Sequence, residues 1–527
     1  MNKNINKFDK VLKLVAPRYA LKRTIARKSI DIINSGYGNY GANTTKKSLR
    51  GWMYYGGSSK EDIEDNVNIL RQRSRDAYMG IPTASAALKT LRTNVIAGGL
   101  LPAPQIDSEF LKLSAEETEK LQADILREFY LWADTSTCDA DGIDNFYKLQ
   151  KLAYLSQLMN GDVLILLQTK KQINQPYQLN LRVVEADRVC SPNGMDILVP
   201  SIVNGHKVHR IVQGIETDAD GVAIAYWVCN QHPLSNDVYS KELKWERVET
   251  IGEKTGRRNA LLIMDRERAG QLRGVPILAP VLEAIKQLGR YTDAEITAAV
   301  LSSMFTVFVK SASPNNIAPF GEMLSPEEQI DALDQNTIEL APGAILSLNP
   351  GEEVQFADPK HPNTGYDVFT NALIKQIGAA LEIPPEVMFK QFTTSFSAAR
   401  GALNEFWRTC TMHRDSFVDM FCQPIYEEWF SEAVARGRIN APGYFSDPVV
   451  KKAYTGCMWN GPARTNLNPV QEVNAAIQRV NAGFSTAQDE TAQMTGGDYN
   501  RNIKLRRMEA LRKREVDMIT EGEINAE

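Results

Sequence analysis

Several groups of glycine residues in the sequence have spacings found in phosphate-binding loops. Gly36, Gly38 and Gly41 match the GxGxxG pattern, which brings backbone N–H groups close to a dinucleotide phosphate. That chemistry requires an apolar helix directly after the glycines and an acidic residue about 20 positions further on in a strand, and neither accompanies the pattern here. The sequence also contains no GxxxxGK[ST] pattern. The glycines therefore predict neither a dinucleotide site nor a Walker-type ATPase.

Histidine and cysteine pairs could in principle bind a metal ion. His206 and His209 lie in a strand-rich region, where a spacing of three residues places them on opposite faces. Cys410 and His413 lie one helical turn apart, but no second pair completes a tetrahedral zinc site. A surface pair and core packing are the favoured interpretations, so no metal site is predicted.

Two aspartate clusters have simpler explanations than catalysis. Asp139, Asp141 and Asp144 surround a glycine, but their spacing departs from the calcium-loop pattern and lacks its terminal glutamate. They favour a loop that starts a helix. Asp218 and Asp220 precede another glycine and are typical of a hairpin turn. With no GxSxG elbow or catalytic triad in the sequence, we expect no catalytic residue and no cofactor.

The elements that position these residues follow from the hydrophobic periodicity. An apolar face that recurs every three or four residues predicts helices, and alternation between turns predicts strands. The expected helices cover residues 63–79, 82–96, 115–132, 146–159, 276–303, 366–381 and 397–436, the last with a possible bend at Pro424. The expected strands cover residues 163–167, 179–184, 209–211 and 222–229. Ser114 and Glu117 form a capping-box pattern before the third helix.

Composition limits the class of protein. The chain has 527 residues, 43% apolar and 24% charged, which is typical of a globular protein of about three or four domains. Its longest uncharged apolar stretch is the 14 residues Ile296–Val309, whereas a membrane helix needs about 18 or more. No secretory signal is recognised. Six cysteines without a CxxC pair favour a reducing compartment. We therefore expect a soluble protein that is assembled inside a cell.

Charge is distributed unevenly along the chain. Residues 1–50 carry a net charge of +10, and residues 501–515 carry +5, although the whole chain has −4. Residues 305–360 carry −7, with nine acidic residues against Lys310 and Lys360. Such segments are most often solvated faces, but they can also be docking surfaces or nucleic-acid arms.

Motifs along nearly the whole chain together resemble the bacteriophage portal proteins of the lambda type. They occur in one order within residues 50–515 and include the runs 138–142, 149–153, 274–281, 290–295, 340–343, 348–352, 383–387, 395–400 and 459–462. Two positions depart conservatively from the family pattern. Asp162 stands where the family usually has glutamate after glycine, and Asn468 stands where aspartate usually precedes proline.

The resemblance implies an α+β portal fold assembled as a ring. Its parts would be a mainly helical wing, two stem helices, a small α/β clip and a helical C-terminal crown. The implied domains are a basic N-terminal arm (1–50), the first part of the wing (51–275), a stem helix (276–304), the clip (305–362), the second stem helix (363–383), a channel loop (384–396), a long wing helix (397–440), and the crown with the C-terminal tail (441–527).

The implied function is that of a non-enzymatic DNA conduit at one vertex of a viral head, used for genome packaging, retention and ejection. The expected partners are further copies of the chain in a ring, commonly of twelve subunits, double-stranded DNA without sequence specificity, the terminase large subunit, a major capsid or scaffolding protein and a head–tail adaptor, with no membrane. The expected location is the portal vertex of the virion, with assembly in the host cytoplasm. The alternatives are a head–tail adaptor, which is generally much shorter, and a nuclease with an unrecognised carboxylate cluster.

Two segments are the candidate functional sites. The channel loop would contact DNA through Lys390, Gln391, Phe392, Thr393, Thr394 and Ser395, a short polar stretch with one cation. The clip would bind the packaging motor through acidic residues that include Glu327, Glu328 and Asp331. Because a ring repeats each charge, the summed field at either place would be strong.

Overall fold

The structure, a computed structural model, describes residues 56–171, 173–236, 242–304, 307–310, 345–348, 365–392, 395–464 and 468–524, with short stretches between residues 16 and 52. The chain forms two units, Met1–Asp62 and Ile63–Glu527. In the first, η2 (Lys47–Leu49) is a 3-10 helix, and the π-helical turn η3 (Lys60–Glu64) spans the boundary. Most of the basic arm, residues 1–50, lies outside the described residues.

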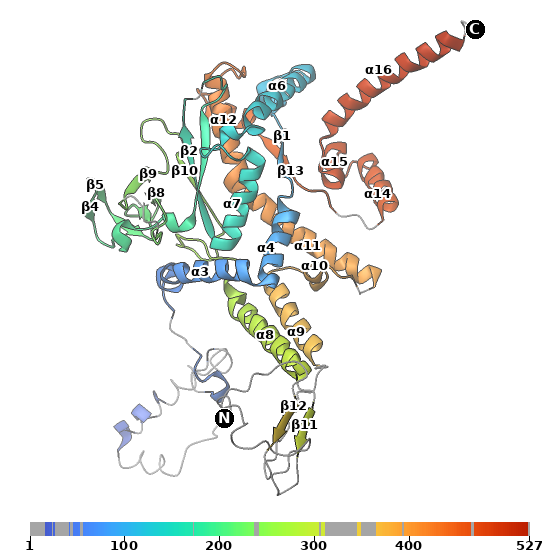
Figure 1. Ribbon diagram of the computed structural model, residues 1–527. Coiled ribbons are helices and arrows are strands. Elements are labelled where there is room, and N and C mark those ends of the chain that lie inside the picture. Colours follow the sequence, from blue (N-terminus) through green and yellow to red (C-terminus); the bar gives the residue numbers. More distant parts are fainter. Residues whose placement is uncertain are drawn as a thin grey trace, which may run out of the picture. The chain divides into compact units, whose positions relative to one another are not determined.

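The larger unit combines helices with small sheets, which confirms the α+β class (Figure 1). Its α-helices are α3 (Asp65–Gly80), α4 (Pro82–Val95), α5 (Ser108–Leu111), α6 (Ala115–Ala133), α7 (Phe146–Asn160), α8 (Leu282–Met304), α9 (Tyr366–Ala380), α10 (Pro385–Phe389), α11 (Phe396–Phe417), α12 (Gln423–Ala435), α13 (Pro448–Thr455), α14 (Pro469–Asn481), α15 (Ala487–Thr495) and α16 (Tyr499–Ile524). The predicted capping box is present, because Ser114 and Glu117 each accept a hydrogen bond from the other's backbone N–H.

The strands are short and mostly antiparallel. They are β1 (Leu101–Pro104), β2 (Asp162–Thr169), β3 (Leu179–Val184), β4 (Ser201–Val203), β5 (His206–Val208), β6 (Arg210–Val212), β7 (Ile215–Thr217), β8 (Ala223–Cys229), β9 (Trp245–Glu249), β10 (Ala260–Met264), β11 (Val307–Lys310), β12 (Ile345–Leu348) and β13 (Cys457–Asn460). One sheet has the order β10-β2-β3 and another is the meander β6-β7-β8-β9. In the first, Ile165 on β2 lies opposite Val183 on one side and Leu261 on the other.

An aromatic core joins α6 and α7 to α12 and to the residues just before it. The Phe129 ring lies 4.9 Å from the Trp429 ring and perpendicular to it, and Phe146 stacks on Phe421 at 5.8 Å. All four side chains are buried. Such offset and edge-to-face pairs add to the large apolar area that aromatic residues bury. Among the described residues, no helix has the length and apolar character needed to cross a membrane.

The long helix expected over residues 397–436 is interrupted by one wider turn. The π-helical turn η8 (Val418–Cys422) links α11 to α12. Pro424 follows directly and cannot donate a backbone hydrogen bond to the preceding turn. A π-helical turn accommodates an extra residue where the regular helical hydrogen bonds are interrupted. The irregularity expected at Pro424 is therefore present as this wider turn.

The helices α8 and α9, which the resemblance implies form the stem, pack side by side (Figure 1). The sequence predicts that the first starts at Pro276, but α8 begins at Leu282 after a 3-10 turn, η7 (Ala279–Val281). Pro280 explains the difference, because it cannot supply the hydrogen bond that a helix from Pro276 would require of it. Between α8 and α9 in the chain, β11 and β12 pair in parallel, with Val307 opposite Ile345.

Candidate functional site: the stem helices and the loop beside them

A buried ion triplet fixes the chain just ahead of the segment that leads into α8. Asp162, the first residue of β2, accepts hydrogen bonds from Arg273 (Nε to Oδ2, 2.7 Å; Nη2 to Oδ1, 2.9 Å) and from Arg71 of α3 (Nη2 to Oδ2, 3.0 Å). All three side chains are at most 1% exposed. We call Arg71, Asp162 and Arg273 the stem clasp, because Arg273 lies just ahead of the segment that leads into α8.

The carboxylate of the clasp is strongly held in its charged form. Burial alone would raise the pKa of Asp162, but Arg273 and Arg71 outweigh it and lower that pKa below the usual 3.8. Burial and the neighbouring Arg273 lower the pKa of Arg71 to about 10. The excess positive charge is spread over backbone carbonyl groups, because Arg273 also donates to the oxygens of Ala186, Val189 and Gln213. The clasp therefore ties helix, sheet and stem together.

Two glycines let the backbones meet beside the clasp. Gly161 has a φ of +88°, and a Cβ atom added to Gly274 would overlap the Gly161 carbonyl group. The Gly274 N–H donates to Asp162 Oδ2 at 2.9 Å. Only glycine permits this approach, because any side chain would separate the two chain segments. Close packing of the two backbones thus explains the glycine at the start of the 274–281 motif.

Aromatic rings join the two stem helices, and apolar side chains remain uncovered further along. Tyr291 stacks on Tyr366 at 5.5 Å and meets Phe369 edge-on at 5.1 Å. The predicted apolar face of α8 is buried at Ile285 but 57% exposed at Ile296. Among the described residues of the larger unit, this part of α8 is therefore apolar and exposed to solvent.

The segment expected to be the channel loop is partly helical. Within residues 384–396, α10 forms because Pro385 occupies the first helical position, which suits its fixed φ. The helix ends at Lys390, whose φ of +55° is left-handed. Buried Met388 anchors α10, and α11 starts behind Ser395, whose Oγ accepts a hydrogen bond from the Ala398 N–H at 3.4 Å. Among the described residues of this segment, 390–392 and Ser395 therefore lie between the two helices.

The described side chains of this shorter loop are open to solvent. Lys390, Gln391, Phe392 and Ser395 are all exposed, Phe392 to 55%. Thr393 and Thr394 lie outside the described residues. Phe396, the first residue of α11, is also exposed, at 57%, so the segment 384–396 carries two exposed aromatic rings that the sequence analysis did not distinguish from its polar residues. The predicted clip residues Glu327, Glu328 and Asp331 lie outside the described residues as well.

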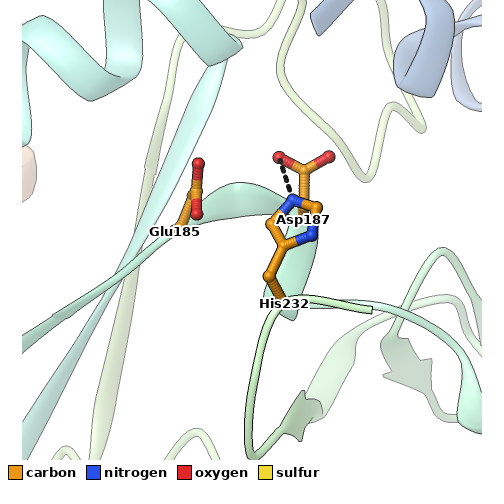
Figure 2. Close-up of side chains that lie close together, drawn as sticks. All are labelled: Glu185, Asp187 and His232. Carbon is orange, nitrogen blue, oxygen red and sulfur yellow. Dashed lines mark ion pairs between the residues drawn. The ribbon is translucent and has the colours of Figure 1, made fainter. Parts of the chain in front are cut away.

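A cluster of Glu185, Asp187 and His232 has the residue types of a metal site (Figure 2). Arg75 already binds both carboxylates, at 2.7 Å to Glu185 Oε1 and 2.5 Å to Asp187 Oδ2. His232 Nδ1 accepts a hydrogen bond from the Leu234 N–H, so in the neutral ring Nε2 carries the proton and faces Asp187 at 4.0 Å. A metal ion would have to displace Arg75 and change this tautomer. The cluster fits an ion-pair network between Arg75 of α3 and the segment that follows β3.

The aspartate clusters of the sequence analysis are turns. Asp139 accepts hydrogen bonds from the backbone N–H groups of Asp141, Ile143 and Asp144, each at 3.0 Å. Asp218 accepts from Asp220 and Val222 between β7 and β8. Their oxygens are engaged in shaping the backbone, as the favoured interpretations require.

The stem clasp is the feature that the sequence analysis missed. Arg71, Asp162 and Arg273 are separated by about a hundred residues from one to the next, so no local spacing connects them. One signal was present, because Asp162 opens a strand that continues with apolar residues to Leu167. A carboxylate at the start of a buried strand requires a cationic partner, but the pattern does not identify which one.

Comparisons with known proteins identify the class. A family model described as phage portal protein, lambda family, matches residues 45–414. Portal protein B of Escherichia phage lambda is 20% identical over 487 residues, covering 88% of each chain, and the portal protein of Escherichia phage N15 is 21% identical over 501 residues, covering 91% of this chain and 90% of that one. A probable portal protein of Halomonas phage phiHAP-1 is 25% identical over 328 residues, covering 62% of this chain and 58% of its own.

The family model covers more than half of the sequence, so the chain belongs to the lambda family of phage portal proteins. It is a structural component of the virion head and not an enzyme, which confirms the expected class. Among solved structures, the neck of a native gene transfer agent particle computed with C12 symmetry is 12% identical with a TM-score of 0.37, and covers 81% of this chain and 92% of its own. Scores this low establish neither a shared fold nor a shared assembly.

Proposed function

We propose that the protein forms a head-to-tail ring of identical subunits, commonly twelve, at one vertex of the virion head. The observation that carries this proposal is the exposed apolar surface of the stem, where Ile296 is 57% and Val368 is 73% exposed. Large apolar side chains on adjacent helices favour association with a partner. In a cyclic ring, the neighbouring subunit covers the same patch on every copy.

Replacing both stem residues with aspartate tests the ring. The I296D/V368D variant should sediment as monomers or small oligomers, whereas the parent should form rings with a central hole in electron micrographs. The matched control is I173D, because Ile173 is 90% exposed between β2 and β3 and is not part of the stem. If the I296D/V368D variant formed normal rings, the exposed apolar surface of the stem would not be the contact between subunits.

The ring would serve as the conduit through which double-stranded DNA is packaged, retained and ejected. The charged residues of α8 nearly cancel, with Lys286 and Arg290 against Glu283, Asp293 and Glu295. Weak electrostatic contact suits a channel in which DNA slides, because each phosphate held by a cation adds to affinity. The exposed Lys390 would contact phosphates without reading the sequence.

The clip, residues 305–362, would be the docking face for the terminase large subunit and later for a head–tail adaptor. The support is its acidic sequence, with a net charge of −7 over residues 305–360. A ring repeats this charge, so a basic partner surface would be attracted.

The basic arm, residues 1–50, would contact an acidic neighbour such as the capsid or scaffolding protein, or DNA, during assembly in the host cytoplasm. Its net charge of +10 supports this role. Deletion of residues 2–45 should leave ring formation intact and reduce incorporation of the portal into heads. A truncated chain that stays monomeric would instead place the arm in the ring interface.

A further inference from the structure

Charge is segregated along the C-terminal helix α16, drawn in red in Figure 1. Residues 501–514 carry seven cations and Glu509, a net charge of +6, whereas residues 515–524 carry four acidic residues and no cation. We call residues 501–514 the basic half of α16. At 1.5 Å per residue, this half is about 21 Å long.

This distribution does not serve the helix itself. The macrodipole favours acidic residues near the N-terminus and cations near the C-terminus, and α16 has neither in its first or last turn. It also does not serve packing, because every residue of the basic half is exposed. Among the described residues, one ion pair joins this half to another element, Lys504 to Glu119 of α6 at 3.3 Å. The other six cations form no ion pair with a described acidic residue.

In a ring, the basic halves of all subunits would combine their charge. Rotational symmetry places the same part of α16 at the same height on every subunit, so these cations would be repeated at one level around the ring. Their mutual repulsion falls when a polyanion lies along them. Cations are distributed around all sides of the helix axis, which suits contact with phosphates and gives no single face to read base edges.

We infer that the basic half of α16 is a second DNA-binding surface, which holds the phosphate backbone of double-stranded DNA in a sequence-independent way. The choice of DNA as the partner rests on the proposed function. The location of the surface rests on the charges of α16 alone. It also differs in physical role from the stem. The stem charges nearly cancel and permit sliding, whereas +6 on one exposed helix would retain DNA that has stopped moving.

Covalently closed circular DNA separates this surface from the channel, because it cannot thread a closed ring. Rings of the full chain are titrated with a closed plasmid at several salt concentrations. In the variant R506Q/R507Q/R512Q/K513Q, the slope of log affinity against log salt should fall by up to about 3.6, since each lost phosphate contact contributes about 0.9. The matched control K170Q/K171Q/K207Q/K254Q removes four exposed cations elsewhere and should bind like the parent.

Charge-preserving substitution completes the test. The variant R506K/R507K/R512K should retain the parent's affinity, because phosphate contact requires charge and not the guanidinium shape. Unchanged plasmid binding by the glutamine variant would overturn the inference, as would loss of binding by the lysine variant. A glutamine variant that no longer forms rings would also overturn it, and would assign the basic half to a contact between subunits. Because only α16 is changed, none of these results bears on passage of linear DNA through the channel.

Discussion

Arg273 holds Asp162 through two parallel hydrogen bonds, Nε to Oδ2 at 2.7 Å and Nη2 to Oδ1 at 2.9 Å, and both side chains are fully buried. The pair joins the start of a wing strand to the segment that leads into the first stem helix. Arg71 binds the same carboxylate from α3. One carboxylate thus neutralises part of the charge of two guanidinium groups that have no access to water.

Replacing Asp162 with asparagine should destabilise the subunit by about 3–5 kcal/mol, because it leaves two buried guanidinium groups without an anion. Chemical denaturation of the full chain, followed by tryptophan fluorescence, measures the change. The control is D218N, which alters a partly exposed aspartate in the turn between β7 and β8. A loss as small as that of the control would show that the clasp contributes little net stability.

The same carboxylate predicts the direction of the acid dependence. The folded-state pKa of Asp162 is lowered below 3.8, so its contribution is fully present above that pH and is lost as the pH falls through the folded-state value. The stability of D162N should therefore decrease less than that of the parent below about pH 4. Parallel stability curves for the two proteins over this range would contradict the assignment.

Replacing Gly274 with alanine should destabilise the junction by about 2 kcal/mol or more, because the new Cβ atom overlaps the Gly161 backbone. The matched control is G289A within α8, where an added Cβ meets no atom within 4 Å. That control should stabilise the protein by up to about 1 kcal/mol through helix propensity. Thermal unfolding of both variants measures the contrast. Equal melting temperatures would mean that the two backbones can separate at little cost.

The K390A/T393A variant should assemble into rings but package or retain less DNA, because each subunit loses the one cation between α10 and α11. The genome content of purified heads measures the effect. The control is K207A, which removes an exposed cation on β5 and leaves both the loop and α8 intact. Heads of the loop variant that hold the full genome would exclude a role of residues 390–395 in the channel.

Reversing the charges of Glu327, Glu328 and Asp331 to lysine should weaken terminase binding without dispersing the ring. Attraction between exposed charges is screened beyond about 8 Å at physiological ionic strength, so the difference should be largest at low salt. Binding of purified terminase to immobilised rings measures it. Equal affinity of parent and variant rings at low salt would remove the electrostatic basis for docking at the clip.

Periodicity predicted much of the fold, because the signals that set helices and strands are local. The elements α3, α4, α6, α7, β2 and β3 lie close to the expected ranges, and the capping box at Ser114 is present, whereas the short elements β1 and α5 were not predicted. Errors occurred where a proline acts over several residues. Pro280 delays the start of α8, and Pro385 starts a short helix inside the segment expected to be a loop.

The candidate sites were less predictable for two physical reasons. The stem clasp depends on two contacts that each span about a hundred residues, and contacts at that separation leave no periodic trace in the sequence. The second reason is that an apolar residue type does not determine burial. Phe396 has a side chain typical of a core but is 57% exposed. The resemblance to portal proteins identified the class of protein. Without it, the residues only excluded other classes.

The π-helical turn Val418–Cys422 determines which side chains of α12 face the core. Its extra residue rotates every later side chain by about 100° relative to an uninterrupted α-helix. Tyr426 and Trp429 reach the aromatic core only with that rotation in place. A single-residue deletion within the turn would produce a more regular helix and turn these rings away from the core. Chain length at this point is therefore constrained more tightly than the identity of any one of its residues.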